Sequence, residues 1–140
     1  MSSKSAGYSG TPLWKKLGIK SGQRIHFYKP PANLDALLEG APLDTSILKS
    51  VRKPVDYIHI FAASTKELKR AIGKFRDKIV DDGMIWVSWY KKASKIPTDI
   101  TEDVVRAICL PTGLVDVKVC AVDDKWSGLK LVIRKELRGK

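Results

Sequence analysis

Lysine and hydroxyl side chains follow several apolar segments at the points where those segments end. Lys91, Lys92 and Ser94 come directly after the apolar run "MIWVSWY", and Ser64 follows "YIHIFAA". Lys29 follows "RIHFY" in the same way. Ammonium groups and the free N–H groups at the start of a helix are well suited to hold anions. This spacing predicts a binding site for the anionic part of a small molecule.

Aromatic and acidic residues elsewhere could complete that site. Tyr8 and Trp126 offer rings that could stack on a planar ligand, and Ser9 lies in the glycine-flanked stretch "GYSG". Asp124 belongs to a turn, "DDKWSG", that we expect at the same edge of the sheet. The hypothesis places the ligand's anionic part between Lys91, Lys92 and the helix start near Ser64. No catalytic residue is predicted, and if chemistry occurs, the first residues to examine are Asp124, Lys91, Lys92 and Tyr8.

The same residues also have structural interpretations. Ser64 and Glu67 have the spacing of a helix capping box, and Asp99 is equally placed to cap a helix. Lysines at strand ends are commonly solvated. His26 and His59 lie inside apolar strands, which favours packed core histidines over catalytic bases.

Composition favours one folded domain. The 140 residues are 44% hydrophobic, so we expect a single domain over 1–140, with 1–6 flexible and 136–140 as a tail. No apolar run has the length of a membrane span and no signal-peptide core is visible, which predicts a cytoplasmic protein without membrane insertion. Cys109 and Cys120 are expected to be buried reduced thiols, and no metal site is predicted.

The charge balance points to anionic partners. Lysine and arginine total 26 against 15 acids, a formal charge of +11, and no acid precedes Asp35. Such a balance favours small anions, and it also allows nucleic acid to bind through nonspecific charge.

Hydrophobic patterning predicts alternating strands and helices. The β-branched run 55–63 is typical of a buried parallel strand, and the apolar residues after Ser64 recur at helical spacing until a turn at Gly83. The expected elements are helices 12–17 (capped by Thr11), 33–39 (capped by Asn33), 65–82 and 99–112, and strands 24–28, 45–51, 55–63, 84–90, 115–122 and 129–135. They predict a three-layer, Rossmann-like α/β fold whose mostly parallel sheet ends in an antiparallel hairpin.

This order, with "LGIKSGQRIHFY" leading into the first strand and "DDGMIWVSW" forming a later one, resembles the class I S-adenosylmethionine-dependent methyltransferase fold. The stretches "GYSGTPLWKKLGI", "WYKKASKIPTDIT" and "GLVDVKVCAVDDKWSGLK" resemble a small bacterial family known only as a domain of unknown function. The methyltransferase resemblance implies a cofactor loop rich in glycine after the first strand, where this chain has "KPPAN". No acid stands at the end of the second strand to hold ribose hydroxyls. We therefore predict no cofactor, and S-adenosylmethionine is the one the fold would otherwise imply.

Three functions remain open on the sequence alone. The first is a domain that binds a small anionic molecule, which the lysine-rich edge and the missing glycine loop favour. The second is a basic protein associated with nucleic acid, supported by charge alone. The third is a divergent methyltransferase or other transferase, although the shortage of catalytic groups disfavours an active methyltransferase.

Overall fold

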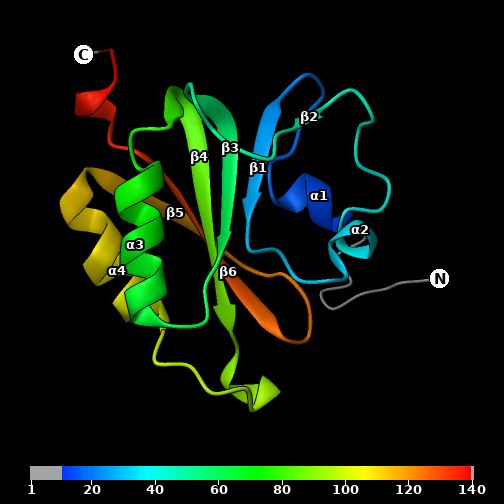
Figure 1. Cartoon of the computed structure of the whole chain (residues 1–140), viewed down its shortest axis with the longest axis vertical. Coiled ribbons are helices and arrows are strands. Elements are labelled where there is room, and N and C mark those ends of the chain that lie inside the picture. Colours follow the sequence, from blue (N-terminus) through cyan, green and yellow to red (C-terminus); the bar gives the residue numbers. More distant parts are fainter. Residues whose placement is uncertain (1–10, 140) are drawn as a thin grey trace.

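The computed structural model describes residues 11–139, and a six-stranded sheet forms its centre (Figure 1). The strand order is β2-β1-β3-β4-β6-β5. The first four strands run parallel, whereas β6 is antiparallel to both of its neighbours, β4 and β5. The strands are β1 (Arg24–Tyr28), β2 (Ser46–Ile47), β3 (Val55–Phe61), β4 (Ile79–Tyr90), β5 (Leu114–Ala121) and β6 (Trp126–Ile133).

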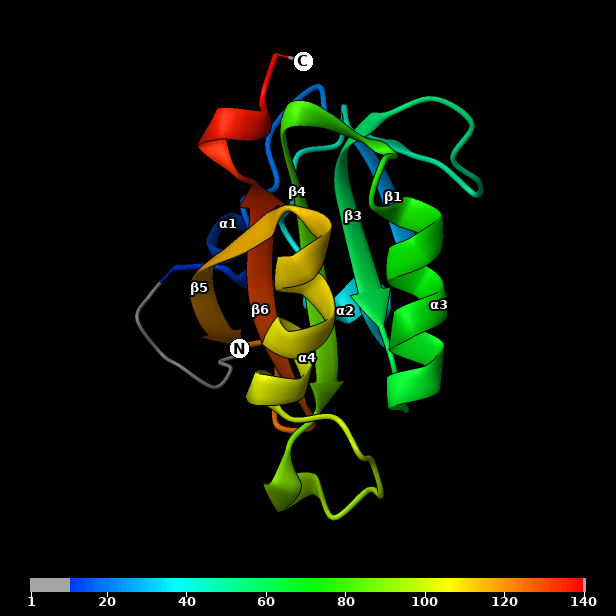
Figure 2. The same cartoon turned by 90° about the vertical axis from the view of Figure 1, so that its left-hand side faces the viewer.

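Helices cover both faces of this sheet, which confirms the predicted three-layer architecture. Figures 1 and 2 show α3 and α4 on one face, and Figure 1 shows α1 and α2 on the other. The helices are α1 (Leu13–Lys16), α2 (Leu34–Leu37), α3 (Thr65–Phe75) and α4 (Glu102–Cys109), with short 3-10 turns η1 (Lys92–Ser94), η2 (Leu110–Thr112) and η3 (Lys135–Leu137).

The core is divided by the sheet into two clusters, and β3 contributes to both. Ile58 and Ile60 point to the α3–α4 side, while Tyr57 and Phe61 point to the α1–α2 side. All four are at most 2% exposed, because a central strand is covered on both faces. This double burial explains why β3 is apolar at almost every position.

Helix α3 begins where its capping residue predicts. Ser64 has an extended backbone and its hydroxyl accepts a hydrogen bond from the Glu67 N–H at 3.2 Å. The buried residues of the helix follow at spacings of three and four and face the sheet: Leu68, Ala71, Ile72 and Phe75.

Strand β4 begins earlier than the sequence predicts. The predicted helix over 65–82 ends at Phe75, and Ile79 to Gly83 belong to the strand, so the predicted glycine turn at Gly83 is wrong. Gly83 is buried, and a Cβ there would lie 3.0 Å from the Asp56 carbonyl oxygen. The register between β3 and β4 shifts at this point. Glycine is therefore needed here because two backbone segments approach closely within an irregular strand. The local sequence had instead predicted a turn at Gly83.

Two predicted caps differ in the structure, and a third is correct in position only. Helix α1 is capped at Pro12 and begins at Leu13, one residue later than a Thr11 cap implies. Asn33 occupies the N-cap position of α2, as predicted, but its side chain makes no capping hydrogen bond. Helix α4 begins after Thr101, whose hydroxyl accepts from the Val104 N–H at 3.2 Å. Asp99, predicted to cap this helix, instead accepts a hydrogen bond from α3.

Candidate functional site

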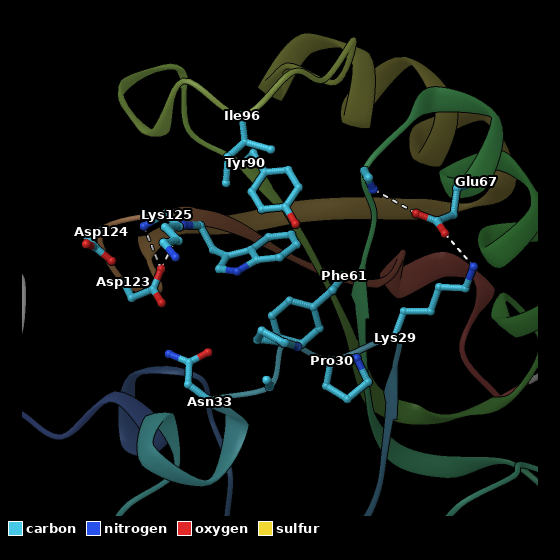
Figure 3. A pocket seen from close by; sticks show the side chains of 14 residues that line it. Lys29, Pro30, Asn33, Phe61, Glu67, Tyr90, Ile96, Asp123, Asp124 and Lys125 are labelled. Carbon is cyan, nitrogen blue, oxygen red and sulfur yellow. Dashed lines mark hydrogen bonds and ion pairs between the residues drawn. The ribbon is translucent and has the colours of Figure 1, made fainter.

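A pocket lies where the strand order reverses. The chain passes from β1 outward to β2 and then returns to the opposite side of β1 to form β3, so the carboxyl ends of β1 and β3 diverge into separate loops. In open α/β sheets, ligands bind at this switch point. A cavity of about 720 Å³ opens there (Figure 3), lined by Lys29, Pro30, Pro31, Ala32, Asn33, Phe61, Ala63, Glu67, Tyr90, Ile96, Asp123, Asp124, Lys125 and Trp126. Its size is that of a small-molecule site.

Three aromatic residues form one apolar surface of the pocket. The rings of Tyr90 and Trp126 are stacked, with centroids 4.1 Å apart and an angle of 29° between the planes. Phe61 meets Trp126 edge-on at 5.1 Å. Phe61 and Trp126 are buried, whereas Tyr90 is half-buried. Because Tyr90 and Trp126 end β4 and begin β6 as paired residues, the sheet itself fixes this stack.

The loop between β1 and α2 forms the facing wall. Lys29 has a backbone φ of 52°, a left-handed conformation that non-glycine residues seldom adopt. Pro30 and Pro31 follow it and have no N–H to offer. Asn33 projects from this side toward the aromatic residues (Figure 3), and its amide has no hydrogen-bond partner among residues 11–139. This wall is therefore apolar and strained, with one free amide.

Glu67 neutralises the nearest lysine. One carboxylate oxygen of Glu67 accepts from the Lys29 ammonium at 2.7 Å, and the other accepts from the Ala63 N–H at 2.8 Å. Partial burial opposes ionisation, but the hydrogen bonds from Lys29 and Ala63 outweigh it and hold the pKa of Glu67 below its ordinary value. Lys29 accordingly brings little free positive charge to the pocket.

The start of α3 is already supplied with acceptors. The Thr65 N–H donates to the Asp99 carboxylate at 2.7 Å, which lowers the pKa of Asp99. The Thr98 hydroxyl donates to the Ala63 carbonyl at 2.8 Å. Through these contacts, Thr98 and Asp99 hold the segment between η1 and α4 against the start of α3. The N–H groups of Thr65 and Glu67, at the start of α3, thus have partners inside the chain.

The turn between β5 and β6 supplies the remaining polar groups. Asp123 closes the turn by accepting from the N–H groups of Lys125 and Trp126, both at 2.8 Å. Asp124 and Lys125 are exposed, and their charged groups have no ion-pair partner within the described chain. The pocket rim therefore carries one free carboxylate and one free ammonium group.

The structure brings together only part of the predicted site. Lys29, Asp124 and Trp126 line the pocket, and the turn after β5 returns to the predicted edge. Ser94 donates to the Lys91 carbonyl and accepts from the Ile96 N–H, and like Ser64 it does not line the pocket. Lys91 and Lys92 are also outside the lining, while Tyr8 and Ser9 lie outside the described residues.

Sequence reasoning missed most of the aromatic lining. Phe61 and Tyr90 are the last residues of β3 and β4, and the rule that ligands lie at the carboxyl ends of strands would have found them. The free amide of Asn33 was interpreted as a helix cap instead. The sequence prediction relied on the polar groups that follow the strands, whereas the last residues of β3 and β4 themselves line the pocket.

A second polar group lies beneath the pocket in the core. His59 is fully buried, with Nδ1 3.0 Å from the Tyr57 hydroxyl and Nε2 2.6 Å from the Ser88 hydroxyl. Burial lowers the pKa of His59 to about 3, so the ring is neutral. Phe61 stacks on it at 4.3 Å and separates it from the pocket. His59 is thus a satisfied core histidine.

Other site types have no counterpart in residues 11–139. Neither a metal-binding group of histidine, cysteine and acidic side chains nor a helix able to cross a membrane is found there. Cys109 and Cys120 are buried free thiols, as predicted, and burial raises the pKa of both.

Comparison with known proteins identifies the fold but no family. No family model and no curated protein sequence matches the chain, so the resemblance to the small bacterial family stays a prediction.

Solved methyltransferase structures, in contrast, superpose on most of the chain. An S-adenosylmethionine-dependent methyltransferase from Aquifex aeolicus matches with a TM-score of 0.64 and 15% identity, over 87% of this chain and 88% of its own. Magnesium protoporphyrin IX methyltransferase from Synechocystis, with bound S-adenosylmethionine, matches at 0.59 and 10% over 87% and 74%. Aeropyrum pernix fibrillarin, also with bound S-adenosylmethionine, matches at 0.53 and 12% over 90% and 70%. The chain therefore has the methyltransferase-like Rossmann fold that its sequence predicts.

Proposed function

We propose that this chain is a small-molecule-binding domain on a methyltransferase-like scaffold, and that its ligand joins a planar ring to an anionic group. The observation that carries the proposal is the pocket at the switch point with the stacked Tyr90–Trp126 pair in its wall. Aromatic walls with a few polar groups are typical of small-molecule sites. Pro30 and Pro31 face the aromatic residues and complete an apolar slot for a ring.

The polar groups without partners suggest how the rest of the ligand is held. The Asn33 amide can both donate to and accept from a ring edge. Lys125 is the lysine of the lining that has no carboxylate partner in residues 11–139, so it is the group to pair with an anion. Asp124 beside it can accept hydroxyl groups. This arrangement suits a molecule of nucleotide type better than a simple inorganic anion.

S-adenosylmethionine, which the fold implies, does not fit the residues present. Its usual loop brings glycine backbone close to the cofactor, whereas Lys29, Pro30 and Pro31 fill this position and the prolines offer no donors. Strand β2 has only two residues, Ser46 and Ile47, and Leu48 and Lys49 follow it without a carboxylate for ribose hydroxyls. The fold is the one feature that favours a divergent methyltransferase, and the residues of the pocket do not add to it.

A thermal-shift and calorimetric comparison of three probes tests the proposal. We expect adenosine monophosphate to stabilise the protein more than adenosine, and S-adenosylmethionine to have no effect. A ligand at a hundred times its Kd adds about 2.7 kcal/mol, an easily measured shift. Asn33→Ala should weaken the binding of both adenosine and its monophosphate. Lys125→Gln should weaken the binding of the monophosphate alone, by roughly five- to tenfold, as expected for about 1 kcal/mol.

Lys66→Gln provides the matched control, because Lys66 is exposed on α3 and lies outside the pocket lining. Equal affinity for adenosine and its monophosphate would contradict recognition of the anionic group. Stabilisation by S-adenosylmethionine would overturn the fit argument and favour the enzyme. If none of the probes binds, an adenine nucleotide is excluded as the ligand.

A further inference from the structure

Five lysines gather on the α1 face of the sheet, away from the pocket lining: Lys16, Lys20, Lys91, Lys118 and Lys130, here called the lysine patch. Lys118 on β5 lies directly opposite Lys130 on β6 in the antiparallel register. The Lys118 ammonium also donates to the Lys16 carbonyl at 2.9 Å, which joins β5 to α1. Sequence reasoning did not find this group, because its members are distant along the chain.

No carboxylate balances the patch within residues 11–139. The ion pairs of that part of the chain involve other basic residues: Arg24, Lys29, Arg76 and Arg106. Burial and the charges of Lys118 and Lys20 lower the pKa of Lys130. The lysines Lys118, Lys16 and Lys91 also act together on the buried Cys120, partly offsetting the effect of burial on its pKa. The lysines thus form two overlapping groups, one around Lys130 and one around Cys120, that share Lys118.

Like charges opposite one another in an antiparallel pair destabilise a sheet. The Lys118–Lys130 pair thus costs the free protein stability that an anionic partner would return. The patch is also extended. Lys130 pairs with Trp86 on β4. Lys91 is five residues after Trp86, which corresponds to about 17 Å between their backbones at the rise of a strand. A single phosphate would contact only one end of it.

We propose that the lysine patch binds the phosphate backbone of a nucleic acid. Each strand of a duplex carries one phosphate per about 3.4 Å of helix axis, so a row of this length faces several phosphates at once. The patch contains lysines alone, which act as flexible point charges without stacking or bidentate recognition. Such contacts bind the backbone and do not read sequence.

The test measures binding of the full chain to a short labelled DNA duplex across a salt series. Substituting Lys20→Gln, Lys118→Gln and Lys130→Gln together should weaken binding strongly at low salt. It should also lower the slope of log K against log salt by about 2.7, since each lost phosphate contact contributes about 0.9. A second duplex of unrelated sequence should bind with the same affinity.

The matched control carries the same loss of charge on another surface: Lys49→Gln, Lys66→Gln and Lys69→Gln, all exposed and outside the patch. This control should keep the wild-type slope within about one unit. An equal effect of both triple variants would overturn the proposal, because net charge alone would then drive binding. Displacement by millimolar inorganic phosphate, or binding to phosphatidylserine vesicles without binding to the duplex, would also overturn it.

Discussion

Among single residues, the buried His59 affects both the position of the pocket wall and the pH dependence of stability. His59 interrupts an apolar strand, yet both ring nitrogens have partners, Tyr57 and Ser88, so its burial leaves no polar atom unsatisfied. Buried polar groups with complete hydrogen bonding fix side chains in one arrangement. Phe61 packs on this fixed ring and is thereby held in the pocket wall. The core network positions the candidate site without contacting it.

His59 also predicts a pH dependence of stability. Its pKa is about 3 in the folded protein and near 6.5 when unfolded, so the unfolded chain binds more protons between these values. The stability contribution is complete above pH 6.5 and is lost as the pH falls toward 3. We expect the free energy of unfolding to fall by about 1.4 kcal/mol per pH unit in this window. Denaturant titrations between about pH 6 and 5.2 measure the slope above the range in which carboxylates become protonated.

The variant His59→Gln should remove most of that slope while lowering stability at neutral pH. Asp99→Asn serves as the comparison, because the pKa of Asp99 is lowered and its contribution disappears only as the pH falls below the ordinary carboxylate range. An unchanged slope in His59→Gln would show that other groups carry the acid sensitivity.

Among the helices and strands, those with one continuous hydrophobic periodicity could be predicted from the local sequence. The strand predicted over 55–63, the start of the helix after Ser64 and the C-terminal strand pair are all present. The helix ends at Phe75, however, and β6 begins at Trp126, within the stretch predicted as a turn. The start of β4 was missed because Asp81, Asp82 and Gly83 have turn-like types, and only pairing with β3 makes them a strand. Asp99 was placed on the wrong helix for the same reason: its partner, Thr65, is 34 residues away. Contacts of this kind are not encoded in local patterns.

The close backbone approach at Gly83 in β4 can be tested by comparing it with Gly73 in α3. Gly83→Ala places a Cβ 3.0 Å from the Asp56 carbonyl oxygen and 3.1 Å from that of Val80, so we expect a loss of about 1–3 kcal/mol, as for an overpacked core. Gly73→Ala in α3 meets nothing within 4 Å and should stabilise the protein by about 0.5–1 kcal/mol. Urea denaturation of both variants gives the two values. Equal effects of the same sign would contradict the close approach at Gly83.

Across the whole molecule, the positions of the charged side chains say more about binding than the total charge of +11 does. The pocket rim is nearly balanced, because Glu67 holds Lys29 and Asp124 lies beside Lys125. Part of the unbalanced charge lies on the α1 face in the lysine patch. The sequence could predict an excess of lysine, but only the strand order brings Lys118 opposite Lys130 and both near α1.

Repulsion within the patch predicts that salt stabilises the protein. Raising ionic strength to about 0.15 M shortens the screening length to about 8 Å, so the Tm should rise from its low-salt value. Lys130→Gln should have a higher Tm than wild type at low salt and a smaller response to added salt. Lys66→Gln, on the solvated face of α3, should follow the wild-type curve. Differential scanning calorimetry at constant pH measures both, and a Lys130→Gln curve parallel to wild type would contradict the repulsion.

The position of β6 has a consequence for how the molecule is made. The last strand along the chain lies between β4 and β5, so these two earlier strands have no pairing partner on that side until β6 is synthesised. During synthesis, α4 and β5 therefore emerge before the strand that joins β5 to the rest of the sheet. Trp126, the first residue of β6, then arrives opposite Tyr90, so the sheet and the aromatic wall of the pocket are completed in the same late step.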